Sequence, residues 1–164
     1  MVSEEIKKQL HQSLTHAQWR KIGIKQHHGL CIPLFSLRTH ASCGIGEFLD
    51  LIPFIDWVKS LGMDVIQLLP LNETGIDPSP YNALSSCALN PLHLSLRELP
   101  LLNEQPQLVK KLASFQLFLK HKRIPYSELK RKKMEWLLEY FKSTYAQISQ
   151  TERYQHFIAH NPWL

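Results

Sequence analysis

The sequence has few cysteines, no long apolar run and no charge excess large enough to define a partner. Its three cysteines, Cys31, Cys43 and Cys87, form no Cys-x-x-Cys pair. An odd number without that spacing argues against a disulfide framework or a zinc site and favours reduced thiols in the cytoplasm. No stretch approaches the roughly 18 apolar residues that span a bilayer, and the charged start lacks the apolar core of a signal peptide. We therefore expect no membrane partner.

Motifs for cofactors are missing as well. The stretch Gly44-Ile45-Gly46 lacks the third glycine of a dinucleotide-binding loop, and there is no P-loop. The nine histidines show no spacing with cysteine or aspartate that is typical of a metal site. We therefore expect no cofactor and no metal.

Charge alone does not point to a partner. Nineteen Lys and Arg against fourteen Asp and Glu give a net charge of +5, which is too small to indicate nucleic acid. Basic residues concentrate between 110 and 133, where apolar residues also recur at helical spacing. We therefore expect this run, Lys130 to Lys133 included, to be the solvated face of helices rather than a nucleic-acid footprint. Glu47 is likewise expected at the surface, at a helix start.

The length and composition predict a folded chain with one core. With 164 residues, of which 44% are apolar, the chain can bury an ordinary core and is not disordered. It is shorter than the roughly 250 residues of a complete eight-stranded α/β barrel.

The first seventy residues show the pattern of an α/β unit. Apolar spacing predicts a helix over 4–22, and short apolar runs predict buried strands at 30–35 and 65–69. Between the strands, Asp50 is expected to cap a helix that ends at Gly62. A strand–helix–strand crossover requires parallel pairing of the two strands. The stripe that this helix is expected to bury consists of Ile52, Ile55, Val58 and Leu61.

A connection without periodic pattern, residues 70–90, follows the second strand. It is rich in Pro, Ser, Asn and Gly, yet it carries Tyr81, Leu84 and Leu89, so we expect it to be ordered. It leaves the C-terminal end of a parallel strand, which is where α/β sheets and barrels bind their ligands. The candidate site therefore lies in this connection.

From Pro106 onward the pattern is helical, and no further strand is predicted. Two strands cannot form a sheet with both faces covered, so the α/β unit reads as the start of something larger. The expected caps and buried stripes are Leu108, Leu112, Phe115 and Leu119; then Ser127 as a cap with Met134, Leu137, Phe141 and Tyr145; then Thr151 as a cap with Tyr154, Phe157 and Ile158.

Motifs in a fixed order carry a resemblance to a known family. They are Gly44-Ile45-Gly46-Glu47-Phe48, then Gln67-Leu68-Leu69-Pro70-Leu71-Asn72-Glu73-Thr74-Gly75, then Ser79-Pro80-Tyr81-Asn82-Ala83-Leu84-Ser85 and Ala88-Leu89-Asn90-Pro91-Leu92. This series is similar to the N-terminal region of the 4-alpha-glucanotransferases, the amylomaltases or disproportionating enzymes of glycoside hydrolase family 77. The resemblance is specific from about Gly29 to Leu96 and weaker beyond.

The resemblance implies the N-terminal part of a (β/α)8 TIM barrel with an inserted helical subdomain. Residues 1–25 would be an N-terminal helical segment, 26–100 the first βαβ part of the barrel with its active-site-face loop, and 101–164 a truncated helical subdomain. The implied activity transfers α-1,4-glucan segments between maltodextrins by a retaining double displacement. The implied partners are the maltodextrin substrate and the remainder of the barrel. The family's catalytic carboxylates come later than residue 164, so we expect no catalytic residue here and no activity from this chain alone.

The Ser79-Pro80-Tyr81-Asn82 turn is the candidate for binding substrate. Pro80 fixes φ, so Tyr81 is presented rigidly with a stacking face and a hydroxyl that suit a sugar ring. The resemblance places Ser79, Tyr81 and Asn82 beside the donor sugars, with Asp77 and Asn90 as secondary candidates. An alternative is that Tyr81 plugs the top of the barrel.

Two further alternatives concern the carboxylates and the function. Glu73 and Asp77 are the carboxylates on the expected ligand face, and their spacing favours a loop-ordering role over a catalytic dyad. The chain could also be a catalytically dead remnant or an interaction module whose basic helices bind a partner.

Overall fold

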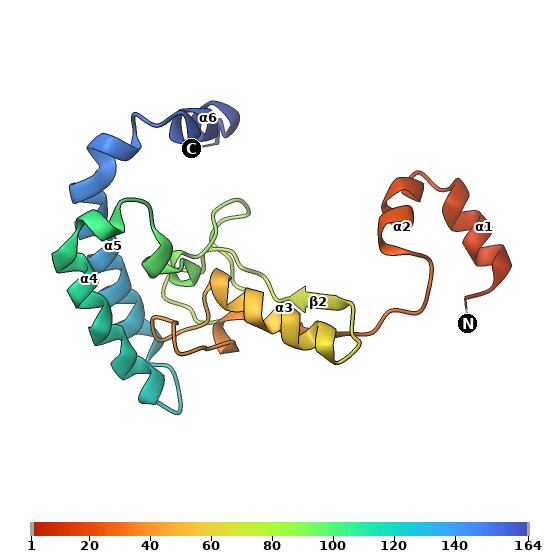
Figure 1. Ribbon diagram of the computed structural model, residues 1–164, viewed down its shortest axis with the longest axis horizontal. Coiled ribbons are helices and arrows are strands. Elements are labelled where there is room, and N and C mark those ends of the chain that lie inside the picture. The colour runs from red at the N-terminus through yellow and green to blue at the C-terminus, as the bar shows by residue number, and fades with distance from the viewer. Residues whose placement is uncertain (1, 164) are drawn as a thin grey trace.

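The computed structural model describes residues 2–163 (Figure 1). Short 3-10 helices, the longest over Ala113–Lys120, fill several of the connections. Within the described range, no helix has the length and apolar character needed to cross a membrane. The helices and strands are α1 (Glu4–Gln12), α2 (His16–Ile22), β1 (Gly29–Ile32), α3 (Leu51–Ser60), β2 (Val65–Leu68), α4 (Pro106–Leu112), α5 (Tyr126–Ile148) and α6 (Glu152–His160).

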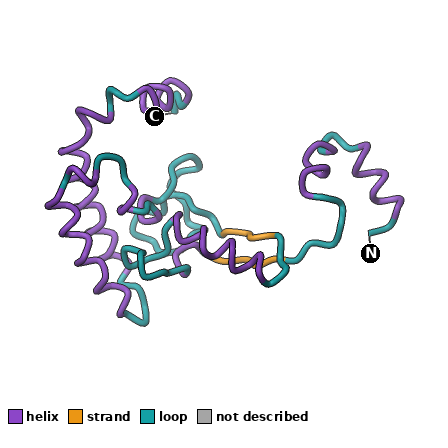
Figure 2. The backbone as a smooth tube through the Cα atoms, in the orientation of Figure 1, coloured by secondary structure: helices purple, strands orange, loops and turns teal. Residues whose placement is uncertain are grey.

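The predicted strand–helix–strand unit is confirmed. β1 and β2 pair in parallel, with Gly29 opposite Val65 and Ile32 opposite Leu68, and α3 forms the crossover (Figure 2). β1 is shorter than the predicted 30–35 because Pro33 has no N–H to donate to a ladder, and the chain continues as a 3-10 turn. As predicted, Gly62 ends the crossover in the left-handed region, with φ of +78°.

The burial predicted for this unit is wrong for the described chain. Val58 is buried, but Ile52, Ile55 and Leu61 are 58%, 49% and 52% exposed. Both strands alternate between exposed and half-buried residues rather than being buried throughout. The cause is that the core lies elsewhere, so only one side of α3 is covered.

The core is formed by the helical part of the chain, residues 106–148, and the loops that pack against it. α4 and the 3-10 helix after it lie beside α5 (Figure 1). Leu108, Leu112 and Phe115 are buried, as predicted. The buried cluster contains Cys43, Ile45, Leu92, Leu96, Leu102, Leu108, Leu112, Phe115, Phe118, Leu129, Trp136 and Tyr140.

The face that α5 buries differs from the predicted one. Met134, Phe141 and Tyr145 are 42%, 52% and 43% exposed. The helix also begins at Tyr126 after Pro125, one residue before the predicted cap Ser127. Helical periodicity fits either stripe, and the true one contains polar residues that the apolar pattern passed over. The buried face consists of Leu129, Lys133, Trp136, Tyr140 and Thr144.

The predicted helix over 4–22 is two helices. The Ser13 hydroxyl donates to the Leu10 carbonyl at 2.7 Å, and the Ser13 backbone leaves the helical region there, which ends α1. α1 and α2 lie at the opposite end of the molecule from α5, joined to β1 by an extended segment (Figure 1). The later cap at Thr151 is confirmed, since its side chain accepts from the Tyr154 N–H at 3.3 Å. The stripe predicted for α6 is wrong, because Phe157 and Ile158 are 49% and 41% exposed.

Candidate substrate-binding site

The connection that follows β2 is ordered, as predicted, by backbone hydrogen bonds between its two limbs. The Glu73 N–H donates to the Ala88 carbonyl at 2.9 Å, and the Asn90 N–H donates to the Leu71 carbonyl at 2.8 Å. The Leu84 N–H folds back onto the Glu73 carbonyl at 2.7 Å. Residues 71–90 therefore form a closed loop at the C-terminal end of a parallel strand, the position where α/β sheets bind ligands.

Asp77 orders the turn that carries the candidate sugar-binding residues. Its Oδ1 accepts from the Ser79 N–H at 2.8 Å, and its Oδ2 accepts from the Asn82 amide at 2.6 Å. These two hydrogen bonds, the Asn82 bond foremost, lower the pKa of Asp77. Tyr81 lies between these two donors in the sequence and is 69% exposed, so its ring stands out from the described residues.

Glu73 also has a loop-ordering role. One of its carboxylate oxygens accepts from the Gly75 N–H at 2.6 Å and from the Lys130 ammonium of α5. Because Glu73 and Asp77 are each occupied by such bonds, their hydrogen bonds favour loop ordering over a catalytic dyad.

Asn90 lies beneath the loop. It is 5% exposed; its Oδ1 accepts from the Leu92 N–H at 3.0 Å and its amide donates to the Tyr126 hydroxyl at 3.2 Å. Thr74 shares a hydrogen bond with the same hydroxyl at 3.2 Å. A cavity beside these groups holds about 20 Å³, room for about one water molecule. This cavity is therefore too small to hold a sugar ring.

The glycines of the first motif serve close packing of the backbone. Gly44 has φ of +87°, and a Cβ on Gly46 would lie 1.7 Å from the Leu34 carbonyl oxygen. These constraints explain why glycine stands at both positions without invoking a phosphate.

Sequence reasoning missed a buried ion pair that joins this first loop to α5. Glu47 and Lys133 are 3% and 0% exposed, so both surface predictions for them are wrong. The Lys133 ammonium donates to Glu47 Oε1 at 2.6 Å and to the carbonyls of Leu92 and Leu94, each at 2.7 Å. Burial raises the pKa of Glu47 and lowers that of Lys133. The available signal was the spacing, since Lys133 lies on the helical stripe of Leu129 and Trp136.

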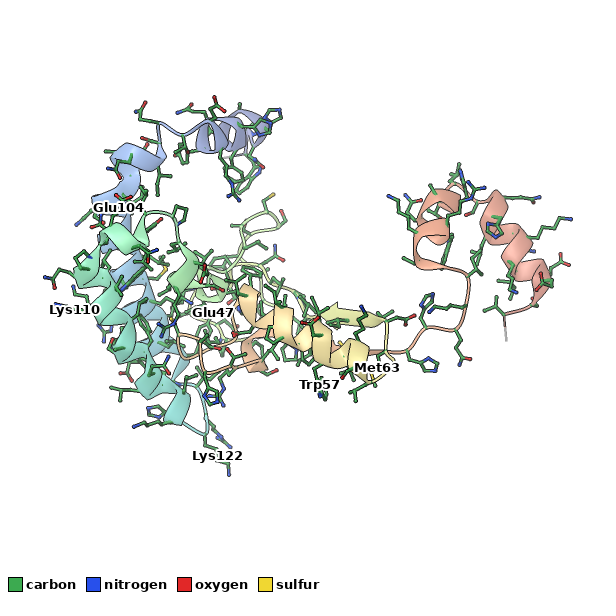
Figure 3. All side chains as sticks on the ribbon, viewed as in Figure 1. Glu47, Trp57, Met63, Glu104, Lys110 and Lys122 are labelled. Carbon is green, nitrogen blue, oxygen red and sulfur yellow. The ribbon has the colours of Figure 1, made fainter. Side chains whose placement is uncertain are left out.

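Two of the other three basic residues of 130–133, Lys130 and Lys132, are also less solvated than predicted. Lys130 is 16% exposed, and Lys132 lies over the rings of Phe115 and Phe118 at 5.6 and 5.3 Å. Arg131 is exposed and pairs with Glu135. Lysines 110 and 122 do lie on the outer surface, whereas Glu47 lies inside (Figure 3).

Asp50 stands at the N-cap position of α3, as predicted, but its buried side chain makes no capping bond to that helix. Its Oδ1 accepts from the Thr39 hydroxyl at 2.6 Å, and its Oδ2 accepts from Ser42 at 2.8 Å and from the Glu47 N–H at 2.7 Å. The carboxylate therefore closes the loop that follows β1 and is not free for chemistry.

The three cysteines of the chain are free thiols and differ in burial. Burial raises the pKa of Cys43 to about 12, so its thiol stays protonated, while Cys31 and Cys87 are exposed free thiols. Over the same range, no group of three or more His, Cys, Asp or Glu side chains is placed to hold a metal ion.

The fold and this loop define an α/β unit whose candidate ligand site lies at the C-terminal end of a pair of parallel strands. The sequence profile described as 4-alpha-glucanotransferase matches residues 32–164. The chain therefore belongs to the 4-alpha-glucanotransferase family, glycoside hydrolase family 77.

Curated relatives agree with this assignment. A 4-alpha-glucanotransferase of Chlamydia pneumoniae is 46% identical over 154 residues, covering 88% of this chain and 29% of the relative. One from Chlamydia caviae is 49% identical over 123 residues, covering 75% and 23%. A 4-alpha-glucanotransferase DPE2 of Oryza sativa subsp. japonica is 38% identical over 92 residues, covering 53% and 9%. The chain thus spans less than a third of the length of these relatives.

Proposed function

We propose that this chain supplies part of the glucan-binding face of a 4-alpha-glucanotransferase that transfers α-1,4-glucan segments between maltodextrins. The observation that carries the proposal is the turn over Ser79–Asn82, in which Asp77 fixes the backbone and Tyr81 is exposed. The Tyr81 ring would stack on the apolar face of a glucose unit, and Ser79 and Asn82 would bond its hydroxyls. Family membership supports the substrate class.

The bond-breaking carboxylates belong outside the described residues. A retaining transfer needs two carboxyl groups about 5 Å apart, one attacking the anomeric carbon while the other protonates the leaving oxygen. The carboxylates in the strand-end loops are held by hydrogen bonds or an ion pair. They are Glu47, Asp50, Glu73 and Asp77. In this proposal the chain binds and orients glucan but does not cleave it.

The proposed architecture places β1 and β2 as the first strands of a TIM barrel. Residues 1–25 would form a leading helical segment, 26–100 the first βαβ part and 101–164 an inserted helical subdomain. The exposed Ile52 and Ile55 of α3, and Leu61 directly after it, support this arrangement because they are suited to packing against further barrel elements. Free thiols favour a reducing compartment, which supports the cytoplasm as the predicted location.

A chimera tests the proposed function. This chain would replace the matching part of the Chlamydia pneumoniae relative, and the product would be incubated with maltotriose. We expect the chimera to disproportionate the glucan, which would be seen as glucose plus longer maltodextrins. We expect no such products from the chain alone. A folded but inactive chimera would contradict the proposed function, whereas transfer by the chain alone would contradict the placement of the carboxylates.

The alternative of a basic interaction module has less support. Two of the four basic side chains in 130–133 are used inside the molecule, Lys133 by Glu47 and Lys130 by Glu73. The exposed basic residues of α5 are therefore too few to form a continuous footprint there.

A further inference from the structure

Lys130 of α5 is the charged contact between the helical part and the candidate sugar loop. Its ammonium donates to the carboxylate of Glu73 and to the carbonyl of Gly75. The two charged side chains are only 16% and 23% exposed. Such a shielded pair is coupled more strongly than a pair on the open surface, where solvent screens the charges.

Glu73 is where the loop closes on itself. Its carboxylate accepts from the Gly75 N–H at 2.6 Å, its N–H reaches Ala88 at 2.9 Å and its carbonyl accepts from Leu84 at 2.7 Å. Gly75 has φ of +64°, and a Cβ there would lie 2.7 Å from the Leu84 side chain, so the turn is tightly packed. Lys130 thus bonds a residue whose backbone N–H and carbonyl both hold other parts of the loop.

A continuous set of hydrogen bonds runs from this turn to the residues proposed to meet sugar. The Thr74 hydroxyl donates to the Asp77 carbonyl at 2.6 Å. The Asp77 carboxylate then accepts from the Ser79 N–H at 2.8 Å and from the Asn82 amide at 2.6 Å. Displacing residues 73–75 would therefore shift the frame on which Tyr81 is mounted.

We propose that Lys130 is a positioning residue for glucan binding: through Glu73 and Gly75 it fixes the height and tilt of the Ser79–Asn82 turn. This inference rests on the proposed function for the identity of the ligand, but the loop contacts that carry it do not. Lys130 itself does not touch the sugar in this account.

Hydrogen exchange of the chain tests the positioning role without any ligand. Lys130→Met should speed exchange of the Glu73, Leu84 and Asn90 amides by about tenfold, because a bond to a charged group is lost, and leave α5 and core amides unchanged. Lys142→Met removes the same charge from an exposed site on α5 and should change neither set. Unchanged loop exchange, or an equal rise across α5 and the core, would overturn the proposal.

Affinity supplies the second readout, with maltoheptaose as the probe. We expect Lys130→Met and Glu73→Gln each to weaken binding about tenfold, the double variant to be no worse than either alone, and Lys130→Arg to retain most of the affinity. Equal affinity in wild type and Lys130→Met would overturn the inference. If the wild-type chain binds no maltoheptaose, the glucan-binding proposal fails, and the exchange experiment still decides whether Lys130 holds the loop.

Discussion

At the scale of single residues, three polar side chains of α5 hold the two strand-end loops. Tyr126, Lys130 and Lys133 follow one another at helical spacing and so share a face of the helix. Tyr126 and Lys130 bond the loop after β2, and Lys133 bonds Glu47 in the loop after β1. The helix therefore aligns both loops at the same end of the sheet.

Removing the Lys133 ammonium should be strongly destabilising. Lys133→Met leaves the buried Glu47 carboxylate and two carbonyls without their donor, at an expected cost of about 3–5 kcal/mol in the free energy of unfolding. Urea unfolding followed by circular dichroism measures this, with Lys142→Met as the control. Adding Glu47→Gln to Lys133→Met should recover part of the loss. A cost below about 1 kcal/mol for Lys133→Met would contradict the role of the pair.

His27 and Asp64 tie the approach of β1 to the start of β2. His27 Nδ1 and Lys25 Nζ each lie 2.8 Å from Asp64 Oδ2, and His27 Nε2 lies 2.9 Å from the Gly23 carbonyl. The bond to Gly23, then that to Asp64, raises the pKa of His27, while the bonds from Lys25 and His27 lower that of Asp64.

The sign of the pH dependence follows from these directions. A raised His27 pKa means stabilisation that is complete below the ordinary value of 6.5 and is lost as pH rises through the folded-state value. The lowered Asp64 pKa gives stabilisation that is present above 3.8 and lost as pH falls through its folded-state value. An NMR titration should show His27 titrating above 6.5 and moving lower in Asp64→Asn. No change in Asp64→Asn would show that the pair does not form.

Among the elements, the turn after β1 is the most tightly constrained. A Cβ on Gly46 would overlap the Leu34 carbonyl oxygen. A Cβ on Gly62 would have nothing within 4 Å, so a substitution there is disfavoured only by the positive φ of the backbone. Gly46→Ala should therefore cost more than about 3 kcal/mol, and Gly62→Ala about 1 kcal/mol. Thermal unfolding of the two variants compares them directly, and similar costs would contradict the close approach.

The elements also show how far sequence reasoning reaches. Periodicity and turn residues predicted β1, α3, β2 and the ordered loop, because those signals are local. The buried face of α5 was not predictable in the same way, since Lys133 and Thr144 are buried only because their polar atoms find distant or backbone partners. The prediction that Ile52 and Ile55 are buried was wrong for a different reason. An apolar stripe shows that a helix face can be covered, but it does not show which element covers it.

In the whole molecule, the sheet side is left open while the helical side is packed. In the described residues, β1 and β2 are paired only with each other. Ile55 and Trp57 of α3, and Leu61 directly after it, are about half exposed. Exposed strand edges and apolar patches favour association.

The chain alone should therefore self-associate. Sedimentation velocity should show species larger than the monomer that grow with concentration, and Ile55→Lys with Trp57→Lys should reduce them. A monomer with a single cooperative unfolding transition would contradict this expectation.

A calorimetric titration with maltoheptaose tests the proposal that the turn over Ser79–Asn82 binds α-glucan. We expect saturable binding that weakens at least about tenfold in Tyr81→Ala and is unchanged in Tyr145→Ala, which truncates an exposed tyrosine of α5. Absence of saturable binding, or an equal loss in the two variants, would contradict it.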